Sequence, residues 1–128
     1  MKLLLLTSIL FLSGCSLFVP SFCDPNQSES VVNIQIAVKR LDCENITKEQ
    51  ISNITDGIEW FQTYSRSSGW RHQDMLELIE PLDTTTTAFV ERYQNEKSIN
   101  PVYCELKKKT MILQSQRIAE AVLGRFKL

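Results

Sequence analysis

Hydrophobic residues recur at helical spacing through the middle of the chain. Between residues 48 and 66, apolar side chains appear every three or four positions, at Ile51, Ile54, Ile58, Phe61 and Tyr64. Thr47 and Gln50 have the sequence pattern of a capping box at a helix start. Gly69 follows as a stop signal. The pattern predicts a helix from about residue 48 to 66.

The segment before this helix fits two periods at once. Helical spacing joins Val31, Ile34, Val38 and Leu41, whereas the alternation of a strand joins Val32, Ile34, Ile36 and Val38. Periodicity alone leaves the choice open. If the segment is a helix, Val32 and Ile36 lie beside its main apolar face. They then either line a groove for a partner or are buried by the rest of the fold.

Two shorter patterns follow the stop at Gly69. The apolar residues between Met75 and Ile79 predict a short helix that ends before Pro81, since proline disfavours helical geometry in the residue before it. A further helix is expected after Asp83, which would cap it. Phe89 and Tyr93 lie one turn apart on that helix and are candidates either for the core or for contact with a partner.

Asn100 and Pro101 indicate the start of a long last helix, with asparagine as the cap and proline at the first position. The helix is expected to run to about Arg125, with an apolar pattern formed by Val102, Leu106, Leu113, Ala121 and Val122. Three consecutive lysines at positions 107 to 109 are expected to form a solvated face. The formal net charge of the chain is −1, so we predict no nucleic-acid partner.

The N-terminus has the pattern of a bacterial secretory signal. A positive start is followed by an apolar stretch of about ten residues, which is too short to span a bilayer. The sequence Leu12-Ser13-Gly14-Cys15 resembles a lipobox, whose cysteine thiol receives lipid, although a plain signal peptide is the simpler alternative. Ser16, in place of the aspartate that favours inner-membrane retention, predicts sorting to the outer membrane.

These features predict three regions. Residues 1–14 are the signal peptide, residues 15–29 are the lipidated N-terminus with a short tether, and residues 30–128 form one domain with a modest core. Cys23 lies in the tether, whereas Cys43 and Cys104 lie beside periodic segments. In an oxidising compartment this placement favours a Cys43–Cys104 bridge. Closing a loop of about sixty residues contributes roughly 4 kcal/mol in the chain-entropy model.

Candidate chemistry for an enzyme is sparse. His72 is the only histidine and is expected to lie exposed in a loop. The chain has no glycine-rich phosphate loop and no cysteine or histidine pair with metal-ligand spacing. We therefore predict a binding protein that is not an enzyme and that carries no cofactor apart from the lipid on Cys15. Trp60 and Trp70 are candidate partner anchors, and Trp70 is rather expected to close one end of the core.

The order of these features resembles the small pilotin lipoproteins of type II secretion systems, the kind that accompany the pullulanase and pectinase secretins. The likeness covers residues 30 to 115 and rests on the Cys43 to Cys104 spacing, the Gly69-Trp70 pair and a third helix that runs into FVERYQ. It implies an all-α fold, a small four-helix bundle with one disulfide tying the first helix to the last. It therefore favours helix for residues 31 to 42.

The resemblance also implies a function. Pilotins of this kind bind the disordered C-terminal segment of a secretin, which becomes helical in a groove of the pilotin. The lipid anchor then carries the pair through the lipoprotein sorting machinery to the periplasmic face of the outer membrane. The candidate groove residues are Val32, Ile36, Phe89 and Tyr93. The lipobox and small size also fit an alternative, a phage- or plasmid-encoded envelope lipoprotein with a lysis or exclusion function.

Overall fold

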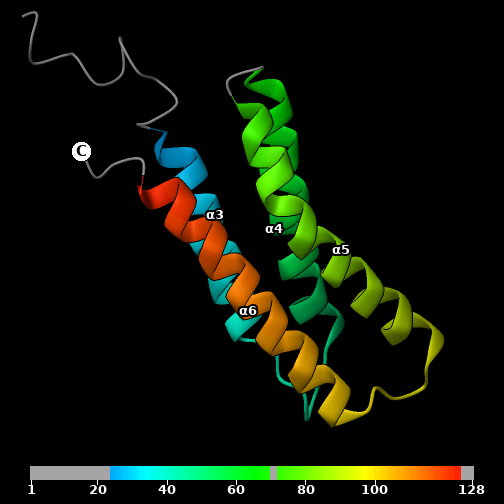
Figure 1. Cartoon of the computed structure of the whole chain (residues 1–128). Coiled ribbons are helices and arrows are strands. Elements are labelled where there is room, and N and C mark those ends of the chain that lie inside the picture. Colours follow the sequence, from blue (N-terminus) through cyan, green and yellow to red (C-terminus); the bar gives the residue numbers. More distant parts are fainter. Residues whose placement is uncertain (1–23, 70–71, 125–128) are drawn as a thin grey trace, which may run out of the picture.

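The computed structural model describes residues 24–69 and 72–124, and this part of the chain forms four α-helices (Figure 1). They are α3 (Pro25–Lys39), α4 (Lys48–Ser67), α5 (Gln73–Asn95) and α6 (Pro101–Gly124). The described residues contain no strand, which confirms the predicted all-α fold. The predictions for residues 1–14, Cys15, Ser16, Cys23 and Trp70 lie outside the described residues.

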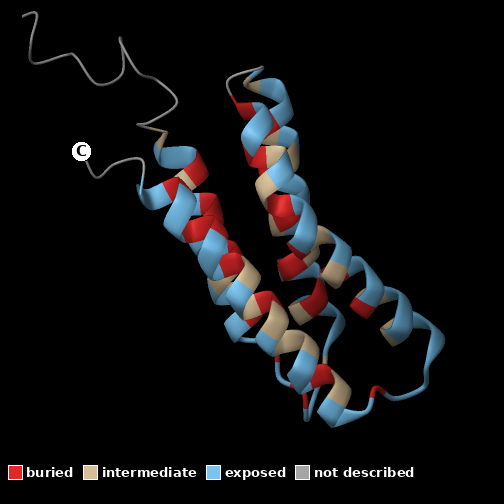
Figure 2. Cartoon of the chain, viewed as in Figure 1, coloured by how far each residue is buried: buried red, intermediate tan, exposed pale blue. Residues whose placement is uncertain are grey.

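The four helices form a bundle in which each helix packs against two others. α3 contacts α4 and α6, and α5 contacts the same two helices from the opposite corner. Figure 2 shows that the buried positions lie on the sides of the helices that face one another. Large apolar side chains from all four helices fill the centre, among them Ile34, Phe61, Leu82, Phe89 and Met111. The predicted four-helix bundle is therefore confirmed.

α3 is a helix, which decides the ambiguity between helix and strand. Val31, Ile34 and Val38 are buried on one face, as helical spacing predicts. The helix begins at Pro25, so residues 25–29 belong to it and not to the predicted tether. Asp24 caps the helix by accepting hydrogen bonds from the backbone N–H groups of the first turn. Asp24-Pro25 is thus the same type of start signal as Asn100-Pro101, and the sequence prediction missed it.

α4 follows its sequence pattern closely. The capping box is present, because the Thr47 hydroxyl accepts from the Gln50 backbone N–H at 3.2 Å and the Gln50 side chain accepts from the Thr47 N–H at 3.4 Å. The core face carries Ile51, Ile54, Ile58, Phe61 and Ser65. Ser65, and not the predicted Tyr64, completes this face. Gly69 follows the helix with φ of 82°, a conformation that glycine adopts without strain.

α5 runs without interruption through Pro81, so the predicted stop before this residue is wrong. Ile79 and Leu82, on either side of the proline, are fully buried, whereas Pro81 itself is exposed. A proline inside a helix destabilises the fold by about 3 kcal/mol, and burial of two large aliphatic side chains stabilises it by a similar amount. Asp83 does not cap a helix; its carboxylate accepts a hydrogen bond from the Gln62 side chain of α4 at 3.0 Å.

α6 starts as predicted, with the Asn100 side chain accepting from the Val102 N–H at 2.8 Å. Its buried face, however, differs from the predicted apolar pattern and consists of Cys104, Met111, Ser115, Ile118, Ala119 and Val122. Of the predicted set, Val102, Leu106 and Leu113 are exposed, at 77%, 62% and 52%. The correction has a simple cause, since the helix carries two apolar stripes and only one of them faces the bundle.

The disulfide joins Cys43, in the loop between α3 and α4, to Cys104 in the first turn of α6, as predicted. The two Cα atoms are 5.6 Å apart, and the bridge spans 61 positions of the sequence. α3 ends at Lys39, four residues before the cysteine, so the bridge holds the loop after the first helix and not the helix itself. It fixes the α3–α4 connection against the start of the last helix.

Candidate binding groove

The four residues predicted to contact a partner do not share one surface. Val32 and Ile36 lie on α3 and are exposed, at 37% and 40%. Phe89 is buried in the core of the bundle, where its ring stacks on Tyr103 with 6.3 Å between the ring centroids. Tyr93 is partly buried and packs against the core. Only Val32 and Ile36 are therefore placed to meet a partner, and Phe89 has a structural position.

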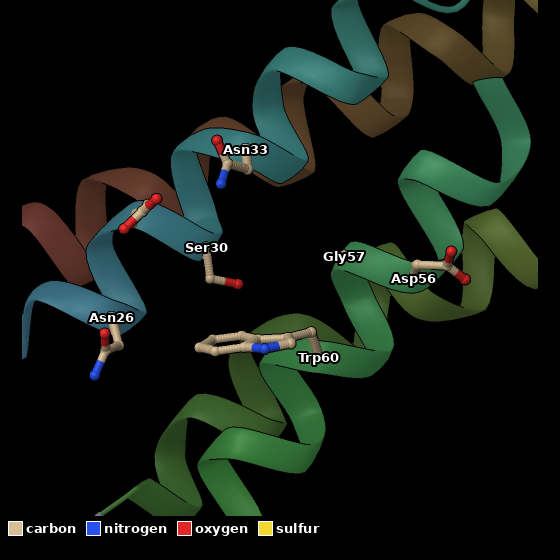
Figure 3. Close-up of a pocket in the computed structure, with 7 residues that line it drawn as sticks. Asn26, Ser30, Asn33, Asp56, Gly57 and Trp60 are labelled. Atoms are coloured by element: carbon tan, nitrogen blue, oxygen red, sulfur yellow. The ribbon is translucent and has the colours of Figure 1, made fainter. Parts of the chain in front are cut away.

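A groove lies between α3 and α4 (Figure 3); Ile36 lines one part of it, whereas Val32 lines neither part. It has a volume of about 440 Å³ and is lined by Asn26, Glu29, Ser30, Asn33, Asp56, Gly57 and Trp60. A smaller hollow of about 260 Å³ continues along the same two helices and is lined by Asn33, Ile36, Ala37, Arg40, Gln50 and Asn53. Asn33 lines both hollows, so they adjoin, and we refer to them together as the α3–α4 groove.

The groove exists because small side chains meet where α3 and α4 face each other. Ser30 and Ala37 lie two turns apart on α3; Gly57 of α4 lines the same hollow as Ser30, and Ala37 lines the smaller hollow. A Cβ atom on Gly57 would be only 3.0 Å from the Ile34 side chain. Glycine in a helix interior is less favourable than alanine by about 1 kcal/mol. The sequence signal for the groove is thus a glycine inside a helix, close to Ile34 of α3, which hydrophobic patterning does not detect.

Trp60 forms one wall of the groove. Its side chain is 47% exposed and extends from α4 toward α3, below Ser30 (Figure 3). The indole stacks on Tyr64 one turn later in α4, with 5.0 Å between centroids and 7° between the planes. An aromatic ring that is half exposed and held by a second ring presents a rigid apolar surface to a ligand. Trp60 is therefore the main apolar feature of the site.

Tyr64 fixes the end of the groove at the start of α3. Its hydroxyl donates to the Asp24 carboxylate at 2.8 Å and accepts from the Asn26 side-chain amide at 3.4 Å. Burial raises the pKa of Tyr64 above its ordinary value, and the Asp24 carboxylate acts in the same direction while the Asn26 hydrogen bond opposes it. The phenol therefore stays protonated at neutral pH and can hold Asp24, so the start of α3 stays attached to α4.

A buried polar cluster lies next to this contact and corrects the expectation for His72. The histidine is only 6% exposed, and its Nδ1 atom is 2.6 Å from the Gln27 side-chain nitrogen. Gln27 also donates to the Ser65 hydroxyl at 3.5 Å. These three side chains join α3, α4 and the start of α5. His72 thus has a structural partner on α3 instead of the exposed loop position that the sequence suggested.

A second hollow, of about 460 Å³, lies along α6 and is lined by Val102, Glu105, Leu106, Lys108, Lys109 and Ile112. All of its lining residues come from one helix, so no second wall faces a ligand. The α3–α4 groove has walls on two helices and a polar and an aromatic component. We therefore take the α3–α4 groove as the candidate site and the α6 stripe as a separate exposed apolar surface.

The described part of the chain was also searched for metal-binding clusters and membrane-spanning helices. Residues 24–69 and 72–124 contain no cluster of three metal-ligating side chains. No helix in these ranges is long and apolar enough to cross a membrane. Comparison with known proteins adds no relative: no family model, curated protein or solved structure matches the chain.

Proposed function

We propose that this protein is a pilotin-type lipoprotein, which binds the C-terminal segment of a type II secretion secretin and takes it to the outer membrane. The observation that supports the proposal most directly is the α3–α4 groove with exposed apolar residues beside it. The proposal also uses the lipobox at Cys15 and the resemblance in cysteine spacing and helix order. It treats the protein as an adaptor without catalytic activity.

The length of the groove along α3 would suit a short partner helix. From Asn26 to Arg40 it follows α3 for about 21 Å, at 1.5 Å of rise per residue. A partner helix of about fourteen residues would cover this length. Such helices bind through apolar side chains spaced at three and four positions. Trp60 and Ile36, near opposite ends of the groove, supply two apolar contact points for them.

The groove is also held in shape before any partner arrives. The Cys43–Cys104 bridge fixes the loop at one end of α3, and the Tyr64 hydroxyl holds Asp24 at the other end. A disordered segment loses conformational entropy when it folds on a partner, which weakens binding for a given contact area. If the groove is already formed, the pilotin-type protein itself loses little conformational entropy on binding, so no further binding free energy is lost. This rigidity suits a site for a flexible tail.

The proposed lipid anchor would place the groove close to a membrane. Residues 15 to 24 span at most about 30 Å when fully extended. Asp24 caps α3, and the groove begins at Asn26. A secretin tail in the groove would therefore travel within a few tens of ångströms of the lipid surface. The Cys15 anchor and the groove together provide the two attachments that a targeting adaptor requires.

Binding of synthetic peptides tests the proposal. The full chain, purified in nonionic detergent, is titrated calorimetrically with peptides covering the C-terminal ends of the secretins encoded by the same genome. We expect one peptide to bind and to gain helical circular dichroism, and we expect Trp60→Ala and Ile36→Glu to weaken it at least tenfold. Leu106→Glu, on the separate α6 stripe, is the matched control and should bind normally. Absence of binding by every peptide would contradict the proposal.

Fractionation in bacteria tests the targeting step separately. Co-expression of the wild-type protein should place the secretin in the outer-membrane fraction. With Cys15→Ala, which removes the lipidated thiol, the secretin should be lost from that fraction while the peptide affinity of the groove is retained. A secretin that reaches the outer membrane equally well with Cys15→Ala would contradict the role of the anchor.

A further inference from the structure

We propose that the outward face of α6 is a dimerisation surface, on which α6 of a second copy of this chain packs in the antiparallel direction. The proposal concerns a part of the molecule outside the α3–α4 groove and does not rest on the proposed function. It assigns one occupant to the exposed α6 stripe, which is the same stripe of another copy.

The exposed face of α6 has the spacing of a coiled-coil seam. Among the described residues, seven large apolar side chains are exposed, and four of them lie on this helix: Val102, Leu106, Leu113 and Leu123. They belong to a series in which steps of four and three residues alternate, as the a and d positions of a heptad repeat do. We call this series the α6 seam, and all of its members are exposed: Val102, Leu106, Lys109, Leu113, Gln116, Glu120 and Leu123.

No element within the described residues covers the α6 seam. α6 packs against α3 and α5 through a different face, which carries Cys104, Met111 and Ile118 among its buried residues. A helix with a second apolar face is typical of a helix that is covered on both sides. From Val102 to Leu123 the seam is about 32 Å long at 1.5 Å of rise per residue, which is enough for a partner helix of similar length.

The polar members of the seam favour a second copy in the antiparallel direction. When Leu106 lies opposite Leu123 of the second copy, the same register places Lys109 opposite Glu120 and Leu113 opposite Gln116. A two-fold axis repeats each of these pairs, so two attractive charge pairs form. A parallel pairing would instead place lysine opposite lysine and glutamate opposite glutamate. Within the described residues, neither Lys109 nor Glu120 has an ion-pair partner.

The hollow on α6 lies where this register requires one. In a coiled coil, each a or d side chain inserts into a hole formed by four residues of the facing helix. Val102, Glu105, Leu106 and Lys109 are spaced as such a hole, and all four line the hollow of about 460 Å³. In the antiparallel register the Leu123 side chain of the second copy enters this hollow. The second helix thus supplies the wall that the hollow lacks in one protomer.

The α6 seam and the α3–α4 groove are separate surfaces. α6 packs against α3 and α5, so α4 lies diagonally across the bundle from α6 (Figure 1). A second copy on the outward face of α6 therefore leaves the groove of each protomer accessible. Dimerisation and peptide binding can then be measured independently, and failure of one does not imply failure of the other.

Sedimentation equilibrium tests the dimer. The full chain is measured in a density-matched nonionic detergent over a range of protein concentrations, and we expect a reversible dimer. Leu106→Glu should raise the dissociation constant at least about tenfold, because it buries a charge against Leu123 of the second copy. Leu106 is 62% exposed, so the variant should keep the wild-type helical circular dichroism. A wild-type chain that is monomeric at every concentration, or a dimer unaffected by Leu106→Glu, overturns the proposal.

Charge reversal tests the antiparallel register. Lys109→Glu and Glu120→Lys should each weaken the dimer several-fold, because each places like charges opposite one another twice. The double variant restores opposite charges and should recover the wild-type dissociation constant. Glu59→Lys, an exposed position of α4, is the control and should have no effect. Single reversals without effect, or a double variant without recovery, overturn the antiparallel pairing.

A lipid surface is the alternative occupant, because Lys108 and Lys109 line the same hollow as Val102 and Leu106. Leu106→Trp is placed in vesicles that contain brominated phospholipid, and its fluorescence is compared with that of the wild-type chain. We expect the added indole to be shielded from quenching by the second copy. Strong quenching of the added indole, together with a monomeric chain on chemical cross-linking, overturns the proposal and assigns the seam to the membrane.

Discussion

The α3–α4 and α5–α6 interfaces belong to the same bundle but are packed differently. Between α5 and α6, the Phe89 ring stacks on the Tyr103 ring, and the Arg92 guanidinium also lies over the Tyr103 ring. The Gln114 side chain donates a hydrogen bond to the Thr85 hydroxyl at 3.0 Å. Between α3 and α4, small residues meet and leave a groove of about 440 Å³. Large side chains thus fill one interface, whereas small side chains keep the other open.

This difference indicates a division of roles within a small domain. The closed interface supplies buried aromatic area, which stabilises the fold. The open interface leaves apolar and acceptor groups accessible, which costs stability but provides a surface for a partner. A substitution in the closed interface should therefore change stability most, and a substitution in the open interface should change binding most.

The largest expected effect is that of Phe89→Ala. The ring is fully buried, so its removal creates a cavity, and such changes typically destabilise by about 3–5 kcal/mol. Guanidinium unfolding of the full chain in detergent measures the loss. Trp60→Ala in the open interface is the matched aromatic truncation, and we expect it to cost less than about 1 kcal/mol, because the indole is half exposed. Equal losses for the two variants would contradict the comparison.

Removal of the disulfide should affect both interfaces. Replacing Cys43 and Cys104 together by serine is expected to lower the free energy of unfolding by about 4 kcal/mol, because the bridge restricts a long loop in the unfolded chain. Guanidinium unfolding measures this loss of stability. Treatment of the wild-type protein with dithiothreitol breaks the same disulfide without a substitution and should give a similar loss. Cys23→Ser is the control and should leave stability unchanged. A loss below about 1 kcal/mol would show that helix packing alone holds the α3–α4 loop.

The elements that local chemistry dictates were predictable from the sequence. α4 was predicted within one residue at each end, because its capping box and apolar spacing agree. α5 was not, since burial of Ile79 and Leu82 outweighs the helix-breaking effect of Pro81, and burial depends on the other helices. The exposed stripe on α6 was mistaken for the core face for the same reason. Periodicity identifies apolar faces and does not say which one is buried.

The candidate site was predictable only in part. Val32 and Ile36 were placed beside the core face of the first helix, and the structure shows both exposed. Phe89 was also a candidate, but its one-turn spacing from Tyr93 fits a core helix equally well. The groove depends on the approach of Gly57 to Ile34 across two helices. No pattern within one segment carries that information, so Ser30, Asp56 and Gly57 were missed.

The smallest expected effect on stability, and the sharpest test of the open interface, is that of Gly57→Ala. Alanine gains about 1 kcal/mol of helix propensity over glycine, but its Cβ would be 3.0 Å from the buried Ile34 side chain. A shift of a few tenths of an ångström in that contact offsets the gain, so we expect stability to change by less than about 1 kcal/mol. Peptide binding should fall, because the added methyl group occupies the floor of the groove.

Gly124→Ala is the matched control for this last prediction. Gly124 lies at the end of α6, where a Cβ would meet nothing within 4 Å, so the substitution should leave both stability and peptide affinity nearly unchanged. Calorimetric titration of the two variants side by side gives the comparison. Normal peptide binding by Gly57→Ala would show that the partner does not reach the floor of the groove. A destabilisation above about 2 kcal/mol would show instead that the α3–α4 interface is packed as rigidly as the α5–α6 interface.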